Sequence, residues 1–162
     1  MAWSASKIFS AFVTDSVNKT KGWSLSGDTI EAALFDNTIT PSQTVASASS
    51  AYGAGVWASG GVVDTGTSAP AGWPALGRPL ASLSSTFATN VYTFDAADTT
   101  SANATTTLTN AYGCLIYDHT TTSPAGVTDQ GICFNYFGGA NSVTLGTFTI
   151  VWNASGICTL TL

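Results

Sequence analysis

The residue best suited to acid-base chemistry is His119, the only histidine of the chain, which follows Asp118 directly. A Ser-His-Asp hydrolase needs a histidine that is oriented by a carboxylate and hydrogen-bonded to a nucleophile. Adjacent side chains of a strand point to opposite faces, so Asp118 is poorly placed to orient His119. The chain also has no GxSxG sequence to form a nucleophile elbow. We therefore favour an exposed polar residue at a loop edge over a cryptic hydrolase, and we predict that the protein is not an enzyme.

Metal and cofactor sites are equally weak in the sequence. Cys114, Cys133 and Cys158 have no CxxC spacing, and each lies in an apolar run, which predicts buried, inert thiols. Asp95 and Asp98 could in principle bind calcium, but an EF-hand needs a longer series of oxygen ligands that ends in a glutamate. Side-chain hydrogen bonds that cap a turn are the favoured role for both. We predict no metal and no cofactor.

The charge pattern argues against a nucleic-acid partner. The strong cations are Lys7, Lys19, Lys21 and Arg78, and the formal net charge is −5. A surface that follows phosphates needs a cluster of Lys or Arg, which these scattered residues do not form. The glycine pairs 60–61 and 138–139 match neither GxGxxG nor a Walker loop, so nucleotide binding has no support.

The aromatic residues suggest binding to another macromolecule. Trp57 and Trp73 lie in residues 42–79, where glycines and prolines are too dense for long strands. Long excursions of this kind are often functional or cover a partner. The two tryptophans could stack on host glycans, but aromatic residues are enriched at the centres of protein interfaces. We favour the interface role over a carbohydrate-binding attachment module.

The N-terminal segment predicts an amphipathic helix over residues 4–18, with Ser4 or Ser6 as its N-cap. Its apolar face must be covered by the chain's own sheet or by a neighbouring subunit, because soluble monomers rarely expose such a patch. This face consists of Ile8, Phe9, Phe12 and Val13. The candidate interface residues are therefore Ile8, Phe9, Phe12, Trp57 and Trp73. The segment lacks a basic region before its apolar residues, and no stretch is long enough to span a membrane, so we expect a soluble protein with no membrane partner.

After the helix the pattern becomes that of an antiparallel β domain over residues 23–162, with short runs of β-branched and aromatic residues between turns. Residues 28–37 predict the first strand. Phe148, Ile150 and Trp152 alternate with more polar positions, which indicates a half-buried strand, and residues 143–162 should end in a hairpin. Seven or eight strands predict a mainly β fold, an antiparallel sandwich or barrel, in one domain that spans residues 1–162.

The sequence also resembles a set of small virion proteins of tailed phages. The resemblance is carried by the helical start, AALFDN, the segment YTFDAADTT, the run AYGCLIYDH and the closing TFTIVWNASGICTLTL, and it covers nearly the whole chain. These motifs concern the fold and contain no active-site signature. Proteins of this kind are described as capsid decoration, minor capsid or tail proteins. The resemblance thus implies a location in the virion and partners such as the major capsid protein or tail proteins.

Composition agrees with this resemblance. Charged residues make up 8% of the chain and hydrophobic residues 44%, so serine and threonine must supply most of the polar surface. A repeated coat component benefits from such a surface, because many copies can pack together without like-charge repulsion. We expect a capsid decoration protein that self-associates, as a trimer by analogy, and binds the outer surface of the assembled capsid. The alternatives are a tail or fibre component and the carbohydrate-binding module.

Overall fold

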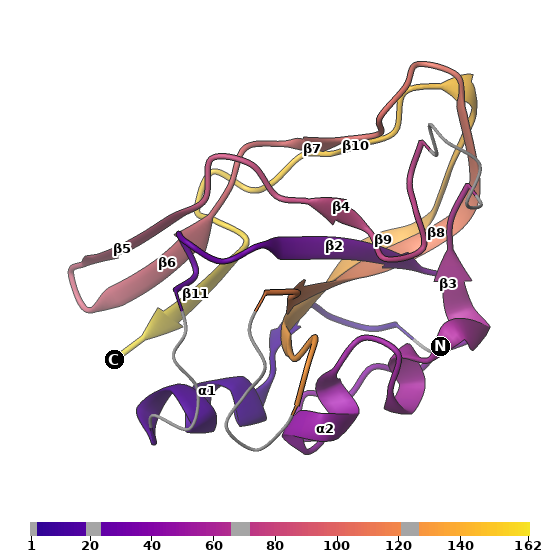
Figure 1. Ribbon diagram of the computed structural model, residues 1–162. Coiled ribbons are helices and arrows are strands. Elements are labelled where there is room, and N and C mark those ends of the chain that lie inside the picture. The colour runs from indigo at the N-terminus through magenta and orange to yellow at the C-terminus, as the bar shows by residue number, and fades with distance from the viewer. Residues whose placement is uncertain (1–2, 19–23, 66–71, 121–126) are drawn as a thin grey trace.

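The computed structural model describes residues 3–18, 24–65, 72–120 and 127–162. Strands predominate over helices, and every strand pair is antiparallel, so the predicted mainly β, antiparallel fold is confirmed (Figure 1). The strands form a six-stranded sheet, a two-stranded ribbon and a three-stranded sheet. None of these described sheets closes on itself. No described helix has both the length and the apolar character that a membrane crossing requires.

The six-stranded sheet, called the main sheet below, has the order β1-β9-β8-β2-β3, with β4 also paired to β2. Its strands are β1 (Lys7–Ile8), β2 (Ile30–Phe35), β3 (Val62–Val63), β4 (Arg78–Pro79), β8 (Thr106–Asp118) and β9 (Gly131–Gly146). The predicted first strand is β2. Nearly every residue of β2 is buried, because other parts of the chain cover the sheet on both faces. Segments that read as separate strands in the sequence are joined in the long strands β8 and β9.

The helical layer lies on one face of the main sheet, below it in Figure 1. It contains α1 (Ser10–Val17), the short helix α2 (Ser47–Ser50) and two 3₁₀ turns, η1 (Gly55–Trp57) and η2 (Ser59–Gly61). The described part of the predicted excursion 42–79 has no long strand, as expected: besides α2, η1 and η2 it contains only the two-residue strands β3 and β4. Residues 66–71 of that excursion lie outside the described residues.

The predicted helix over residues 4–18 is too long at its start. The backbone of Lys7 and Ile8 pairs with Phe134 and Cys133 of β9, and the amide of Phe9 donates to Ile132 O at 3.0 Å. These sheet hydrogen bonds hold the segment extended, so the helix begins at Ser10. Its N-cap is Phe9, without a side-chain hydrogen bond, and not Ser4 or Ser6.

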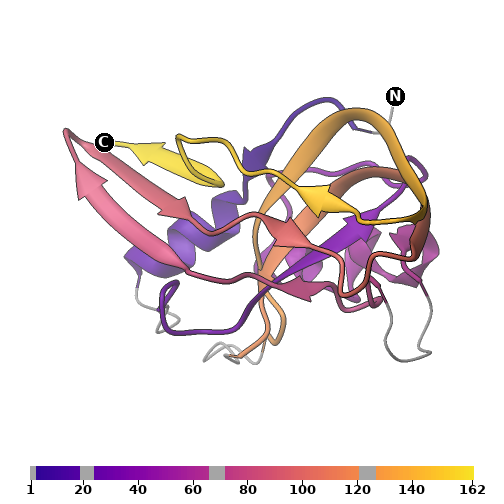
Figure 2. The ribbon, with the colours of Figure 1, turned by 90° about the horizontal axis from the view of Figure 1, so that it is seen from above.

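The ribbon of β7 (Thr99–Thr100) and β10 (Thr149–Ile150) lies on the side of the main sheet away from the helical layer, and a three-stranded sheet lies beside the main sheet (Figure 1). This three-stranded sheet consists of β5 (Ser84–Ala88), β6 (Val91–Asp95) and β11 (Cys158–Thr161), and it projects from the body with α1 beneath it (Figure 2). We call it the projecting sheet.

The closing residues alternate as predicted but pair differently. Phe148 and Ile150 are buried, whereas Thr149 and Val151 are exposed. The predicted final hairpin is wrong: β10 pairs with β7, and β11 pairs with β6 in the projecting sheet. The turn between them does contain a glycine with positive φ, Gly156 at +98°. The pairing of β10 and β11 with strands much earlier in the chain therefore prevents these two strands from forming a hairpin with each other.

Candidate functional site: an apolar groove beneath the projecting sheet

Two of the predicted interface residues, Trp57 and Trp73, are core residues in this structure, each with 0% of its surface exposed. The indole Nε1 of Trp73 donates to Ala32 O at 3.1 Å, and its ring meets Phe148 edge-on. Neither tryptophan offers a face to a partner or to a sugar ring. The reason is that the turns of the glycine-rich excursion fold back onto the main sheet.

Trp57 lies at the centre of an aromatic cluster on the helix-covered face of the main sheet. Its ring centroid is 5.1 to 6.0 Å from those of its four neighbours, mostly in edge-to-face geometry, which favours aromatic pairs. The cluster consists of Trp3, Phe9, Phe35, Trp57 and Phe134. Gly113 lets Trp3 approach the sheet, because a Cβ on this glycine would lie 2.5 Å from the Trp3 ring. Phe9 is thus another predicted interface residue that is fully buried.

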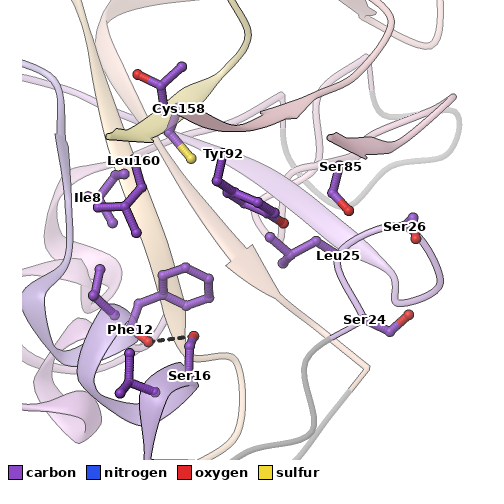
Figure 3. A pocket seen from close by; sticks show the side chains of 13 residues that line it. Ile8, Phe12, Ser16, Ser24, Leu25, Ser26, Ser85, Tyr92, Cys158 and Leu160 are labelled. Carbon is purple, nitrogen blue, oxygen red and sulfur yellow. Dashed lines mark hydrogen bonds between the residues drawn. The ribbon is translucent and has the colours of Figure 1, made fainter. Parts of the chain in front are cut away.

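The remaining predicted interface residues, Ile8 and Phe12, line an open groove between α1 and the projecting sheet (Figure 3). The groove has a volume of about 710 Å³. Its apolar wall is made of Ile8, Phe12, Val13, Val17, Leu25, Tyr92 and Leu160. Of these, Val17 is the most open, with 76% of its surface exposed. We call this feature the α1 groove.

Regular structure explains how distant residues meet in the α1 groove. Phe12 and Ser16 are one helical turn apart, so they share a face of α1, and the Ser16 hydroxyl donates to Phe12 O at 2.7 Å (Figure 3). Leu160 and Tyr92 are cross-strand partners of β11 and β6, so both side chains point to the same face of the projecting sheet. The groove is therefore enclosed between one helix face and one sheet face.

The chemistry of the α1 groove suits apolar side chains and not catalysis. Hydroxyl-bearing residues also line the groove, namely Ser16, Ser24, Ser26, Ser85 and Thr159, and no charged side chain of the described residues does so. The ionisable groups at its wall are the phenol of Tyr92 and the thiol of Cys158. The groove can therefore exclude water from apolar groups and donate hydrogen bonds at its edge.

The surroundings of two of the three thiols make those two unreactive. Cys114 and Cys133 are buried, as the sequence predicts, while Cys158 is only partly buried at the groove wall. A hydrogen bond with the Cys158 thiol, together with burial, raises the pKa of Cys133. Burial raises the pKa of Cys114. Both buried thiols therefore stay protonated at neutral pH, and a protonated thiol is a poor nucleophile.

His119 occupies a separate polar site at the end of β8. Its side chain is 41% exposed, and its Nδ1 lies 2.7 Å from Asp129 Oδ1, so the carboxylate partner is Asp129 and not the neighbouring Asp118. Asp118 is buried and accepts a hydrogen bond from the Thr120 amide. A catalytic triad would require a hydroxyl on the other ring nitrogen, and no hydrogen bond of the described residues supplies one. The pair resembles the orienting half of a triad without a nucleophile.

Glu31 lies near this pair on β2 and is half-buried. Burial raises the pKa of Glu31, while the charges of His119 and Arg78 act in the opposite direction. One carboxylate oxygen, Oε2, is buried without a described hydrogen-bond partner. Next to it, burial also raises the pKa of Tyr117, whose hydroxyl donates to Leu76 O at 2.6 Å.

The acidic residues considered for calcium are not gathered into a site. Asp98 accepts a hydrogen bond from the Trp152 amide at 3.0 Å, which is a backbone-capping role. Asp95 is the last residue of β6, and its cross-strand partner is Ser84 of β5. In the part of the chain that the structure describes, no group of three or more His, Cys, Asp or Glu side chains could hold a metal ion.

Comparison with known proteins adds no relative: no family model, no curated protein and no solved structure matches this chain. The α1 groove and the projecting sheet are the features of the molecule that bear on its function.

Sequence reasoning missed half of the α1 groove. Leu25, Tyr92 and Leu160 were not singled out, because each lies in an ordinary strand or turn context. Alternation gives a usable signal for two of them: Tyr92 and Leu160 each lie between threonine or valine positions, in the period-two pattern of a one-sided strand. What the sequence lacks is the register that brings these strands over α1.

Proposed function

We propose that this protein is a non-catalytic structural component of a tailed-phage particle, with capsid decoration as its role, and that it binds neighbouring protein subunits through the α1 groove and the projecting sheet. The observation that carries this proposal is the open, apolar groove with Val17 at its edge, which is lined by no charged side chain in the part of the chain that the structure describes. Apolar surface of this kind marks protein contacts in soluble proteins. An open form of a β-sandwich, with the projecting sheet extended past the main sheet, suits such a role.

The phage setting itself comes from the sequence resemblance, and the geometry supports only the binding role within it. A coat component must contact many copies of a partner, and the apolar side chains that line the groove can meet another uncharged surface without repulsion. Carbohydrate attachment is disfavoured, because Trp57 and Trp73, the tryptophans proposed for sugar stacking, are buried. The location on the capsid or on the tail is decided by experiment.

The test combines localisation with a surface variant. Cryo-electron microscopy of particles should show density for this protein on the outer capsid surface. Val17→Lys places a charge at the groove edge, where a helix C-terminus accepts a cation without loss of folding. Buried in an interface, that charge should reduce the copies per particle about tenfold in quantitative mass spectrometry, equivalent to about 1.4 kcal/mol.

The matched control is Val151→Lys, since Val151 is 73% exposed but lies outside the α1 groove, beyond β10. This variant should be incorporated like the wild type. Density confined to the tail would replace decoration by a tail role, and absence of the protein from purified particles would refute the virion proposal. Equal losses in both variants would show that the groove is not the contact.

A further inference from the structure

Strand β5 is an open edge of the projecting sheet. It pairs with β6 on one side, and the sheet order β11-β6-β5 leaves its other side unpaired (Figure 2). All five residues, Ser84–Ala88, are exposed, and Phe87 keeps 60% of its surface open. No hydrogen bond from another described element reaches that side of β5. An open edge is a ready template for another strand.

The register identifies which backbone groups point outward. Thr89 and Asn90 have φ values of +52° and +64°, so they form a two-residue turn with both central residues left-handed. Ala88 and Val91, which flank it, exchange hydrogen bonds, and such pairs alternate along an antiparallel ladder. The amide of Ile157 in turn donates to Phe94 O at 2.8 Å, so the backbone of Phe94 points away from β5. Its partner Ser85 must therefore direct its amide and carbonyl outward, and the same holds for Phe87.

Among the described residues, this edge has none of the usual protection. Monomeric proteins block an exposed edge with lysine, proline, a bulge or a covering loop. The sequence of β5 is Ser-Ser-Thr-Phe-Ala, and its pairing with β6 runs without a register shift. No charged residue occurs from Pro79 to Phe94. The other outer strand, β11, is better covered, because Cys158 contacts Cys133 of the main sheet.

We infer that β5 is a self-association edge, which pairs antiparallel with β5 of a second copy about a two-fold axis at Thr86. The axis fixes the pairing: Ser85 of each copy faces Phe87 of the other, and their outward amides and carbonyls meet. Thr86 then faces its own counterpart in a non-hydrogen-bonded pair, and threonine pairs are favourable there. Two copies of β5 can therefore pair so that every outward amide and carbonyl of one copy meets an outward group of the other. For this reason we take the partner of this edge to be a second copy of the chain.

The side chains support the same pairing. Phe87 and Tyr92 are cross-strand partners, so the Phe87 ring lies on the face that also lines the α1 groove through Tyr92 and Ser85. Across the axis the two Phe87 rings are diagonal neighbours, a spacing that aromatic side chains can bridge. Each ring then covers surface that is open in one copy alone. The paired sheet also brings two α1 grooves into one continuous assembly.

A single strand pair is a small interface, well below the size of a stable obligate dimer. We therefore expect a weak dimer that forms at high protein concentration and dissociates on dilution. Within a particle, attachment of both copies to one lattice would strengthen the contact through effective concentration. This last step rests on the proposed function, whereas dimerisation itself does not.

Sedimentation equilibrium of the purified protein over a range of concentrations tests the inference. Ser85→Pro removes an outward amide and leaves the hydrogen bonds to β6 intact, a position at which an edge strand tolerates proline. It should weaken dimerisation at least about tenfold, while the control Ser85→Ala, which keeps the amide, should dimerise like the wild type. Phe87→Lys, which places like charges together, should also give monomers and does not depend on proline being accommodated.

Amide hydrogen exchange gives a readout specific to the edge. The amides of Ser85 and Phe87 should gain protection as concentration rises, while those of Thr86 and Ala88 should be protected at every concentration by β6. A wild type that stays monomeric throughout, or a dimer that persists in both Ser85→Pro and Phe87→Lys, overturns the inference. Particle incorporation is measured separately, so loss of the phage role and loss of β5 pairing give different results.

Discussion

The aromatic cluster and the projecting sheet use similar residues with opposite results. In the cluster, large rings from a 3₁₀ turn, an extended N-terminal segment and two strands of the main sheet bury one another completely. In the projecting sheet, Phe87, Tyr92 and Leu160 come from regular strands, yet they stay partly or largely exposed. Irregular segments thus join the strands of the main sheet in the core, whereas the regular strands of the projecting sheet form an open surface. Residue type alone does not decide which surface is available to a partner.

The difference comes from what lies opposite each region. The aromatic cluster has the main sheet on one side and the helical layer on the other, so every ring finds a neighbour. The projecting sheet extends beyond the main sheet, and among the described helices α1 alone lies beneath it (Figure 2). A three-stranded sheet needs one covered face for stability, and the α1 groove supplies that cover incompletely. The consequence is a surface that folds with the protein and still has apolar area to offer.

The largest expected effect lies in the aromatic cluster. Trp57→Ala removes a fully buried ring with aromatic neighbours on several sides, so the free energy of unfolding should fall by about 3–5 kcal/mol in urea denaturation. The control Val56→Ala, at a partly exposed position beside it, should cost less than about 1 kcal/mol. If Trp57→Ala cost as little as its control, the cluster would not be the core that separates the two regions.

An intermediate effect is expected at the boundary between the regions. Phe12 is nearly buried but borders the α1 groove, so Phe12→Ala opens space that is continuous with solvent and creates no closed cavity. We expect a loss of about 2 kcal/mol, below the range for a fully enclosed phenylalanine. Urea denaturation measures it, with Thr14→Ala on the exposed face of α1 as the control. A loss above about 4 kcal/mol would mean that the groove is closed in solution.

A smaller effect tests charge in the buried region. Because burial raises the folded pKa of Glu31 above its usual value near 4.5, the folded state binds the proton more tightly than the unfolded chain. Stability from this group is therefore full at low pH and falls as pH rises through the folded pKa. Glu31→Gln should raise Tm by about 1–2 °C at pH 7 and leave it nearly unchanged at pH 3.5. A lower Tm at pH 7 would show that contacts with Arg78 or His119 outweigh burial.

The smallest effect is expected at the exposed rim. His119→Ala removes the pair with Asp129, in which both side chains are partly solvated, and should cost at most a few tenths of a kcal/mol. Particle assembly should be unchanged. A hydrolytic activity on host-wall glycans or esters that this variant abolishes, with an intact circular dichroism spectrum, would replace the structural role with an enzymatic one.

Local pattern in the sequence predicted the strand Ile30–Phe35, the alternation of Phe148 and Ile150 and the apolar character of Phe12, because each depends on neighbours two to four positions away. It failed where distant backbone pairing decides the structure. The local pattern predicts a helix at Lys7 and Ile8, but in the structure their backbone pairs with Phe134 and Cys133. The local pattern also predicts a hairpin at the closing residues, but in the structure Thr149 and Ile150 pair with Thr100 and Thr99.

The tryptophans illustrate the other limit. Trp57 lies among glycines and small residues, a context that predicts a loop, and nothing nearby in the sequence shows that Trp3, Phe9 and Phe134 converge on it. For the same reason only half of the α1 groove could be predicted from the sequence. The apolar face of Ile8 and Phe12 is a local pattern, whereas its cover by Tyr92 and Leu160 depends on sheet register.

The wide sequence separation of the α1 groove residues has a kinetic consequence. Its walls come from residues 8–17, 24–26, 85–92 and 158–160, so it cannot exist until segments from across the chain have met. Contacts between such distant segments form late and slowly, because a long loop must close before they are gained. A chain trapped short of the native state would retain local strands such as the β5–β6 hairpin but would lack the groove. Any partner that recognises the groove would therefore bind fully folded copies and exclude incompletely folded ones from assembly.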